Sequence, residues 1–184
     1  TFNLDEYIGL PSGHPKSYRS FMNGQLFDHV NIDQSKTHLP ATGLIAEGVS
    51  ADEVASRYEA LIVESPSIDL QLLGIGTNGH IGFNEPGASA DSITRVVDLA
   101  PSTIAANSRF FDSPDQVPKQ AITMGISTIM RARKIVLMAT GQSKAEAIAS
   151  AIEGPVSPDN PASYLNDHSD ALFILDREAA SAIA

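Results

Sequence analysis

The sequence contains no cysteine among its 184 residues. Disulfide bridges and thiolate metal ligands are therefore excluded, and a cysteine-free chain suits the reducing cytoplasm, where we expect this protein. Long hydrophobic runs are also missing. No stretch approaches the roughly 20 apolar residues that span a bilayer, and no charged segment precedes a short apolar one as in a signal peptide. With 42% apolar and 18% charged residues, the composition is that of a soluble globular protein.

Basic residues are scarce, since 12 lysines and arginines stand against 22 acidic residues and the formal net charge is −10. A surface of that sign repels nucleic acid and anionic lipid, so we expect neither a nucleic-acid nor a membrane partner. If the ligand is itself an anion, the few basic side chains must be concentrated at its site.

Strand-like apolar runs alternate with amphipathic, helix-like runs along the chain. Strands are predicted at 1–4, 68–76, 93–99, 134–140 and 170–176, and helices at 17–30, 50–65, 102–111, 141–154, 161–168 and 177–184. Residues 123–130 are predicted to form a core strand and turn. This alternation predicts an α/β fold, a Rossmann-like open and mostly parallel sheet flanked by helices, in one domain over residues 1–184. The chain starts without methionine and partway through a strand, so we expect residues to be missing at the front.

Three predicted strands end in residues that can do chemistry. Asp5 follows the first strand, the loop 76–86 follows the second, and the turn 141–144 follows "KIVLMAT". Ligands of open parallel sheets bind beyond the carboxyl ends of the strands. We therefore expect these three segments to meet at one rim.

Asp5 and Glu6 form an acidic pair at the first of these ends. Such a pair often caps a helix or lies in a solvated turn. A carboxylate held at a strand end can also act as a general base, because partial burial raises its pKa toward working pH. The two side chains should point in different directions, so at most one is the base. Position alone leaves the choice open.

The loop "GTNGHIGFNEPG" is more informative. Its glycines permit positive φ and close approach of a ligand. His80 is a residue of the type most often used for acid–base work at neutral pH, and Glu85 can orient its imidazole if the loop folds back, with Asn78 in the same network. A glycine-rich turn with a merely structural histidine is the alternative. No second histidine lies at ligand spacing, so a metal site is not expected.

Lys144 and Arg109 are the candidate anion ligands. Lys144 lies at the start of a helix that follows a strand and Gly141, where backbone N–H groups and the helix dipole favour a phosphate. The segment lacks the pattern of a nucleotide-binding P-loop. Arg109 lies on a helix of otherwise apolar or small residues and offers a bidentate guanidinium. A surface lysine and a salt-bridged or snorkelling arginine are the alternatives.

Taken together, these segments resemble the glucosamine-6-phosphate deaminase family (glucosamine/galactosamine-6-phosphate isomerases). The resemblance runs from Thr1 to the final "ILDREAA" and is carried in order and spacing by "TFNLDEYIGL", "GIGTNGHIGFNEPG", "ANSRFF", "VPKQAITMGISTI" and "ATGQSKAEAI". The loop "GHIGFNEPG" is its most specific element, because related 6-phosphogluconolactonases lack "FNEP" there.

The resemblance implies conversion of glucosamine 6-phosphate and water to fructose 6-phosphate and ammonia, in amino-sugar catabolism. It implies that Asp5 is the base that moves the C2 proton to C1 through an enolamine, and that His80, assisted by Glu85, opens the pyranose ring. Arg109 and Lys144 match the family's phosphate ligands. No metal or organic cofactor is implied, and the expected partner is a small-molecule sugar phosphate.

The sequence departs from the family's pattern at several positions, and two other functions remain as alternatives. The family's N-terminal strand, phosphate loop and helix are absent, and Asn78 stands where some members have Asp. The basic cluster of hexameric, allosteric members keeps Arg95 but has Val97 for a lysine and Ala88 for a serine. We therefore expect a monomer or small homo-oligomer. The alternatives are a 6-phosphogluconolactonase-like hydrolase and a non-catalytic sugar-phosphate-sensing domain.

Overall fold

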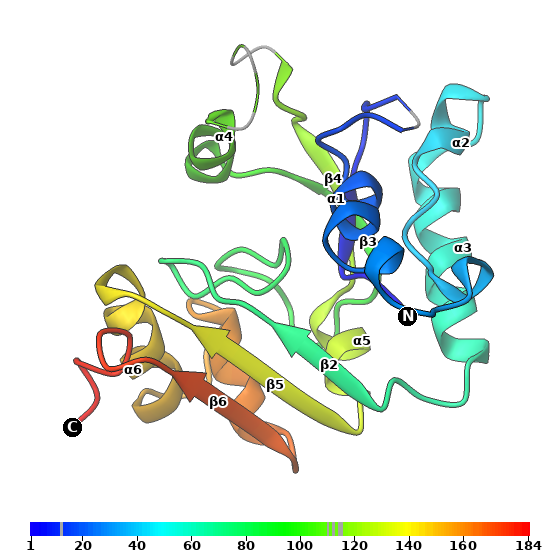
Figure 1. Cartoon of the computed structure of the whole chain (residues 1–184). Helices are drawn as coiled ribbons and strands as arrows, with labels where there is room; N and C mark the ends of the chain where they lie inside the picture. The colour runs from blue at the N-terminus through cyan, green and yellow to red at the C-terminus, as the bar shows by residue number, and fades with distance from the viewer. Residues whose placement is uncertain (12, 110, 112, 114–115) are drawn as a thin grey trace. The chain divides into compact units, whose positions relative to one another are not determined.

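The structure, a computed structural model, describes residues 1–11, 13–109, 111, 113 and 116–184. The chain divides into two compact units, residues 1–61 with 94–123 and residues 62–93 with 124–184. Within the described residues the strands form two three-stranded sheets, one in each unit. The mixed α/β class is confirmed, and the parallel, helix-flanked sheet is that of the second unit (Figure 1). That residues 1–184 form one domain stays a prediction.

The sheet of the first unit is antiparallel. Its strands β1 (Asp5–Tyr7), β4 (Gln120–Thr123) and β3 (Arg95–Asp98) lie in the order β1-β4-β3, with Asp5 opposite Thr123. The prediction of a strand at 1–4 is wrong, because there only Phe2 makes an isolated bridge. Asp5 therefore begins a strand of an antiparallel sheet and does not follow a parallel one.

The helices of the first unit are α1 (Tyr18–Gln25), α2 (Gly43–Ala46), α4 (Pro101–Ser108) and α3 (Ala51–Glu64), whose last turn belongs to the second unit; short 3-10 turns lie at Phe27–His29 and Gln34–Lys36. The prediction for α3 is confirmed. Ser50 Oγ accepts from the backbone N–H of Glu53 at 3.2 Å, which caps the helix. Val54 and Ala55 then pack with Ile122 of β4.

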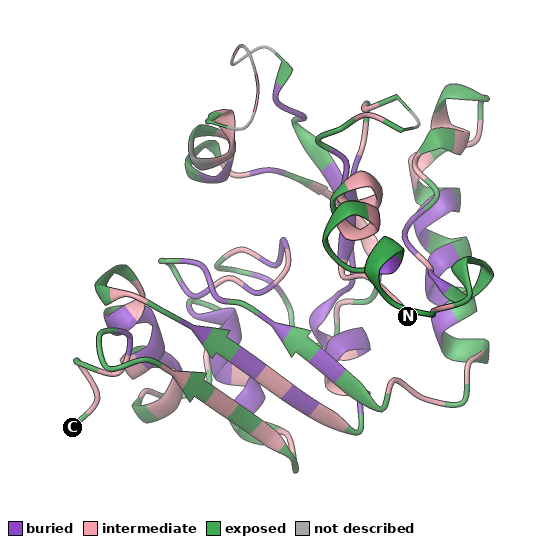
Figure 2. Ribbon diagram, in the orientation of Figure 1, coloured by how far each residue is buried: buried purple, intermediate pink, exposed green. Residues whose placement is uncertain are grey.

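The predicted helix 17–30 is shorter than expected, and its apolar positions are mostly wrong. The helix stops at Gln25, where Leu26 takes φ −138° and ψ −58°. No residue of α1 itself is buried, and Phe21 within it is 56% exposed (Figure 2). The break at Leu26 then changes the direction of the side chains that follow, so Phe27 is buried whereas Leu26 and Val30 are exposed. The predicted helix 102–111 becomes α4, which ends at Ser108, and Phe110 of the predicted range lies outside the described residues.

The sheet of the second unit is parallel, as predicted. Strands β2 (Leu70–Leu73), β5 (Lys134–Ala139) and β6 (Ala171–Leu175) lie in the order β2-β5-β6. Its helices are α5 (Ile126–Met130), α6 (Ala145–Glu153) and the 3-10 segments η4 (Gln142–Lys144) and η5 (Pro161–Asp167). The strand-and-turn prediction for 123–130 missed α5, and the helix predicted at 177–184 is a series of turns.

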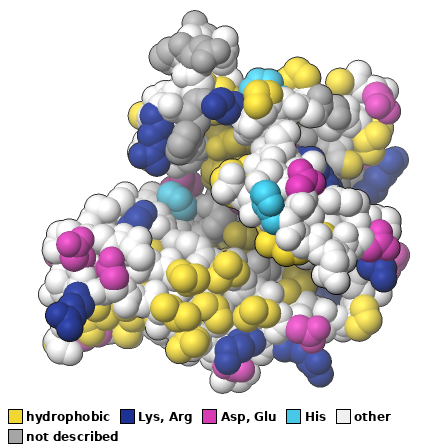
Figure 3. Space-filling view, viewed as in Figure 1, with side chains coloured by type: hydrophobic (Ala, Val, Ile, Leu, Met, Phe, Trp, Pro, Cys, Tyr) yellow, Lys and Arg dark blue, Asp and Glu magenta, His cyan; other side chains and the backbone are white. Residues whose placement is uncertain are grey.

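The two faces of this sheet differ. Helix α6 lies on one side of the sheet (Figure 1). Ile135 and Leu137 of β5 are fully buried, as is Ile148 of α6. The other face presents apolar side chains that keep about half of their surface exposed: Leu70, Leu72, Met138, Leu172 and Ile174. They gather over β2, β5 and β6 in Figure 3. No helix of the described chain is long and apolar enough to cross a bilayer.

Candidate active site

The histidine loop, residues 76–88, starts a few residues after β2. The backbone N–H of Gly76 donates to the carbonyl of His80 at 2.9 Å, and Gly79 adopts φ +87° between them. This turn lays the imidazole of His80 directly against Gly76, where an added Cβ would lie 2.2 Å from the ring. Gly76 is therefore needed for space and Gly79 for its backbone conformation.

Three side chains of this loop form one hydrogen-bonded network. Asn78 Oδ1 lies 2.7 Å from His80 Nδ1, and Asn78 Nδ2 donates to Glu85 Oε2 at 2.7 Å. Glu85 Oε2 also lies 3.4 Å from His80 Nδ1. The imidazole and the carboxylate keep 26% and 20% of their side-chain surface exposed. The loop thus folds back on itself and brings Asn78, His80 and Glu85 together, as the sequence predicted.

This network determines which nitrogen of His80 carries the proton. The carboxylate of Glu85 only accepts hydrogen bonds when ionised, so the Asn78 amide must turn its NH2 group toward it. The amide oxygen then faces His80 Nδ1, and Nδ1 must be the protonated nitrogen. Nε2 is left with its lone pair available for a proton, which is the tautomer that a general base needs.

Lys144 lies at the same edge of the sheet as the histidine loop, because β2 and β5 are parallel neighbours. Gly141 turns the chain at φ +88°, and Lys144 is half-buried at the end of the 3-10 turn that starts α6. Burial lowers the pKa of the Lys144 ammonium, so the charged form gains from an anion nearby.

The turn 141–144, which was predicted to bind phosphate, differs from the prediction in one respect. The backbone N–H of Gly141 is not available to a ligand, because it donates to both carboxylate oxygens of Asp176 at 3.1 and 3.0 Å. Asp176 follows β6, and its Oδ1 also accepts from the N–H of Ala179 at 2.7 Å. Sequence reasoning missed this acid, whose signal is an aspartate immediately after the apolar run "ALFIL".

Asp5 and Glu6 of the first unit are both buried but differ in their partners. The carboxylate of Glu6 accepts three backbone N–H groups: those of Tyr7 at 2.9 Å, Tyr18 at 3.0 Å and Arg19 at 2.9 Å. Burial, followed by the repulsion of Glu6, raises the pKa of Asp5 to about 7. Glu6 is therefore a structural acceptor for the first turn of α1, whereas Asp5 is poised to gain and lose a proton near neutrality.

Arg109 is exposed at the C-terminal end of α4, in the same unit as Asp5. The helix that carries it is joined to β1 because Asn107 Nδ2 donates to the hydroxyl of Tyr7 at 3.0 Å. Tyr7 in turn stacks on Tyr18, with ring centroids 5.0 Å apart. This Tyr7–Asn107 link was not predicted from the sequence.

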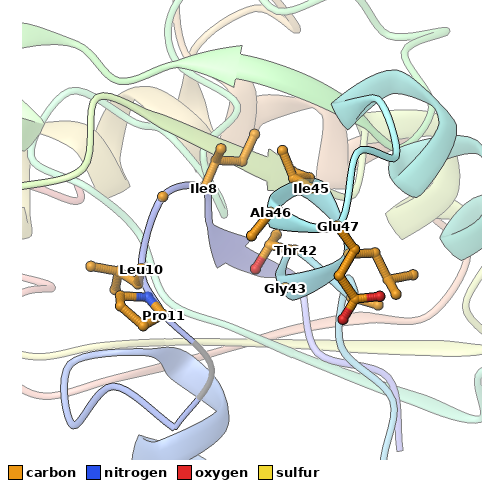
Figure 4. Close-up of a pocket in the computed structure, with 11 residues that line it drawn as sticks. Ile8, Leu10, Pro11, Thr42, Gly43, Ile45, Ala46 and Glu47 are labelled. Atoms are coloured by element: carbon orange, nitrogen blue, oxygen red, sulfur yellow. The ribbon is translucent and has the colours of Figure 1, made fainter.

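The predicted residues thus fall into two sets, Asn78, His80, Glu85 and Lys144 in the second unit and Asp5 and Arg109 in the first. A cavity of about 750 Å³ in the first unit contains none of them (Figure 4). Its walls are the loop 8–11 and the segment 41–47 around α2, and Glu47 is the one charged side chain among its lining residues. It lacks the convergent polar groups of a ligand site. No cluster of three metal-ligating side chains occurs within the described part of the chain.

A parallel sheet with an oriented histidine at its carboxyl edge defines the chain as an α/β protein equipped for acid–base chemistry. Comparison with known proteins is more specific. The family model for glucosamine-6-phosphate isomerases and 6-phosphogluconolactonase matches residues 2–174. The chain belongs to this family.

Individual relatives agree with that assignment. The chain is 57% identical to a glucosamine-6-phosphate deaminase of Rhodopirellula baltica over 184 residues, which cover 98% of this chain and 70% of the relative. It is 52% identical to one of Shouchella clausii, covering 98% and 72%. A solved monomeric glucosamine-6-phosphate deaminase matches with a TM-score of 0.92 and 48% identity over 99% of this chain and 74% of that one. The 6-phosphogluconolactonase of Trypanosoma cruzi shares the fold, with a TM-score of 0.75 at 23% identity over 96% and 69%.

Proposed function

We propose that this protein is an enzyme that converts glucosamine 6-phosphate and water to fructose 6-phosphate and ammonia. The observation that carries the proposal is the Glu85–Asn78–His80 network, which holds one imidazole in the tautomer that can accept a proton at Nε2. The high identity to glucosamine-6-phosphate deaminases supports the choice of substrate. A purely sensing domain has no need for a histidine oriented in this way.

In the first step, His80 opens the sugar ring. Its Nε2 takes the proton of the C1 hydroxyl and returns a proton to the ring oxygen as the C1–O5 bond breaks. Asn78 and Glu85 stabilise the imidazolium that exists between these two transfers, because Asn78 Oδ1 and Glu85 Oε2 both face Nδ1.

In the second step, Asp5 removes the proton from C2 and delivers it to C1. The aldehyde oxygen at C1 takes up a proton as the enolamine forms, and the amine gives up a proton as the C2 imine forms. Water then hydrolyses the imine to the ketone and ammonia. A carboxylate with its pKa near 7 suits this role, because it is ionised often enough to take the proton and basic enough to hold it. Glu6 is the weaker candidate, since three N–H donors already satisfy its carboxylate.

Lys144 and Arg109 are proposed as the ligands of the phosphate. Lys144 supplies a half-buried positive charge at the edge of the sheet that carries His80, and Arg109 supplies a planar guanidinium. Every step is a proton transfer or a hydrolysis, so the proposal includes no metal or organic cofactor. We further propose a cytoplasmic enzyme that is a monomer or small oligomer, in keeping with the similar monomeric deaminase.

The test is a continuous assay of ammonia release from glucosamine 6-phosphate, with 6-phosphogluconolactone hydrolysis measured in parallel. We expect ammonia release by the wild type and its loss in His80→Gln. Lactone hydrolysis without ammonia release would replace the proposal by the lactonase function. Binding of glucosamine 6-phosphate with neither reaction would favour a sensing domain.

A further inference from the structure

Residues 157–164, called here the backing segment, lie against the histidine loop within the second unit. Three hydrogen bonds join the two: Ala162 N–H to Gly79 O at 2.9 Å, Gly87 N–H to Pro158 O at 2.8 Å and the Tyr164 hydroxyl to Ala88 O at 3.2 Å. The segment is itself braced by Ser163, a fully buried residue whose hydroxyl bonds both the N–H and the carbonyl of Ser157. The histidine loop therefore rests on a rigid support.

Asn160 is the side chain of this segment that touches two functional elements at once. Only 8% of it is exposed. Its Nδ2 donates to the carbonyl of Ala147 at 2.9 Å, in the first turn of α6 just after Lys144. Its Oδ1 packs against Gly79, the residue before His80, so closely that a Cβ added there would lie 2.2 Å away.

The orientation of this amide is fixed, and its oxygen has an unusual environment. If the amide were turned over, its oxygen would face the carbonyl of Ala147, which is repulsive. In the observed orientation Oδ1 is buried and makes no hydrogen bond with any described residue. A buried acceptor without a partner calls for an explanation, because most are satisfied. Here the oxygen occupies the space that a side chain at Gly79 would need, so it is held by packing against this glycine.

We propose that Asn160 is a positioning residue that sets the histidine loop at a fixed distance from the helix that follows Lys144. The proposal rests on the function proposed above, in which His80 opens the ring of a sugar whose phosphate is held by Lys144. In this role Asn160 acts through its neighbours Gly79 and Ala147 and not through a bond to the substrate. Small displacements of an acid–base group have large consequences for rate, so a support at this point matters.

Two variants and one matched control test this role. Asn160→Ala removes both contacts, and Asn160→Asp keeps the shape but replaces the donor with an oxygen that repels the carbonyl of Ala147. The control is Asn166→Ala. Asn166 Nδ2 donates to Ala151 O at 2.7 Å, one turn further along α6, so it loses a similar bond without involving the histidine loop.

The first readout is independent of activity. The ring signals of His80 are followed by ¹H–¹⁵N NMR of the full chain and assigned by their disappearance in His80→Gln. We expect both Asn160 variants to shift or broaden these signals and to weaken the Nδ1–H tautomer, while Asn166→Ala leaves them unchanged. The second readout is ammonia release. We expect kcat to fall about 10- to 100-fold in both Asn160 variants, with KM changed less than about threefold, and to stay at the wild-type level in the control.

The outcomes separate this proposal from the proposed function. If the wild type releases no ammonia, the function is wrong, and the NMR arm alone decides on the positioning role. Unchanged His80 signals in both Asn160 variants would overturn the role whatever the activity. Equal effects of Asn160→Ala and Asn166→Ala on the His80 signals would also overturn it, since that would show general destabilisation. If Asn160→Ala does not fold, Asn160→Asp, which keeps the packing against Gly79, gives the same two readings.

Discussion

Replacing Asp5 by asparagine should make the protein more stable at neutral pH while abolishing its activity. Asp5 is 91% buried, and burial followed by the charge of Glu6 raises its pKa from 3.8 to about 7. For an acid, a pKa raised in the folded state means that the fold binds more protons than the unfolded chain between these two values. The stability contributed by Asp5 therefore falls as pH rises from about 4 to about 7 and is constant above that.

The size of the effect follows from the shift. A shift of about three pKa units destabilises the folded state by about 4 kcal/mol at pH 8. At pH 5, below the folded-state pKa, the destabilisation is only about 2 kcal/mol. Asparagine has the shape of the carboxyl group but no charge. The free energy of unfolding of Asp5→Asn, relative to wild type, should therefore rise by about 2–3 kcal/mol between pH 5 and pH 8. Urea unfolding at a series of pH values measures this directly.

A neighbouring substitution supplies the control. Glu6→Gln should lower stability across the same pH range, because an amide NH2 would replace one of the oxygens that accept three backbone N–H bonds. Exchange of the C2 proton of the substrate with solvent should be lost in Asp5→Asn, by about 10²–10⁴-fold. An Asp5→Asn protein whose relative stability is flat between pH 5 and 8 would refute the burial argument. Proton exchange at the wild-type rate would refute the assignment of the base.

Three further predictions concern the other residues of the site. Asn78→Ala should lower kcat for ammonia release about 10- to 100-fold with little change in substrate affinity, because the His80 ring loses its tautomer control; an unchanged kcat would remove Asn78 from the mechanism. Arg109→Ala and Lys144→Ala should each weaken binding of glucosamine 6-phosphate about 10- to 100-fold and of unphosphorylated glucosamine much less, as calorimetry would show. Equal losses for both sugars would indicate a structural role. Substrate saturation should be hyperbolic and insensitive to N-acetylglucosamine 6-phosphate, because Val97 replaces a lysine of the allosteric members and coupling energies are only about 1–3 kcal/mol; sigmoidal kinetics relieved by that ligand would contradict this.

The parallel sheet and the histidine loop were predictable from sequence because their signals are local. "KIVLMA" and "ALFIL" are short apolar runs bounded by polar residues, and they form β5 and β6. The loop places His80, Asn78 and Glu85 within seven residues, with glycines that allow the chain to fold back. Residues so close in sequence need only a turn to meet, and the glycine spacing indicates that turn.

The errors have a different origin, because they depend on partners distant in sequence. β1 pairs with β4, more than a hundred residues away. Because of this antiparallel pairing, Asp5 is the first residue of a strand, whereas the prediction placed it after the end of one. The end of α1 is a local exception, because Leu26 leaves the helical range and only Phe27, of the side chains predicted to face the core there, is buried. Asp176 and Asn160 carry no motif of their own. Each gains its role only when β6 or the backing segment is placed beside another loop.

Asp5 and Glu6 show most clearly what sequence cannot decide. They are adjacent carboxylates, both buried, and nothing in "NLDEY" separates them. The separation comes from the start of α1, whose first N–H groups, those of Tyr18 and Arg19, point at Glu6. Once Glu6 is held there as an anion, its charge adds to the cost of a second one beside it, and Asp5 holds its proton up to about pH 7. A helix start twelve residues further along the chain thus distinguishes the two carboxyl groups and makes Asp5 the one proposed as the base.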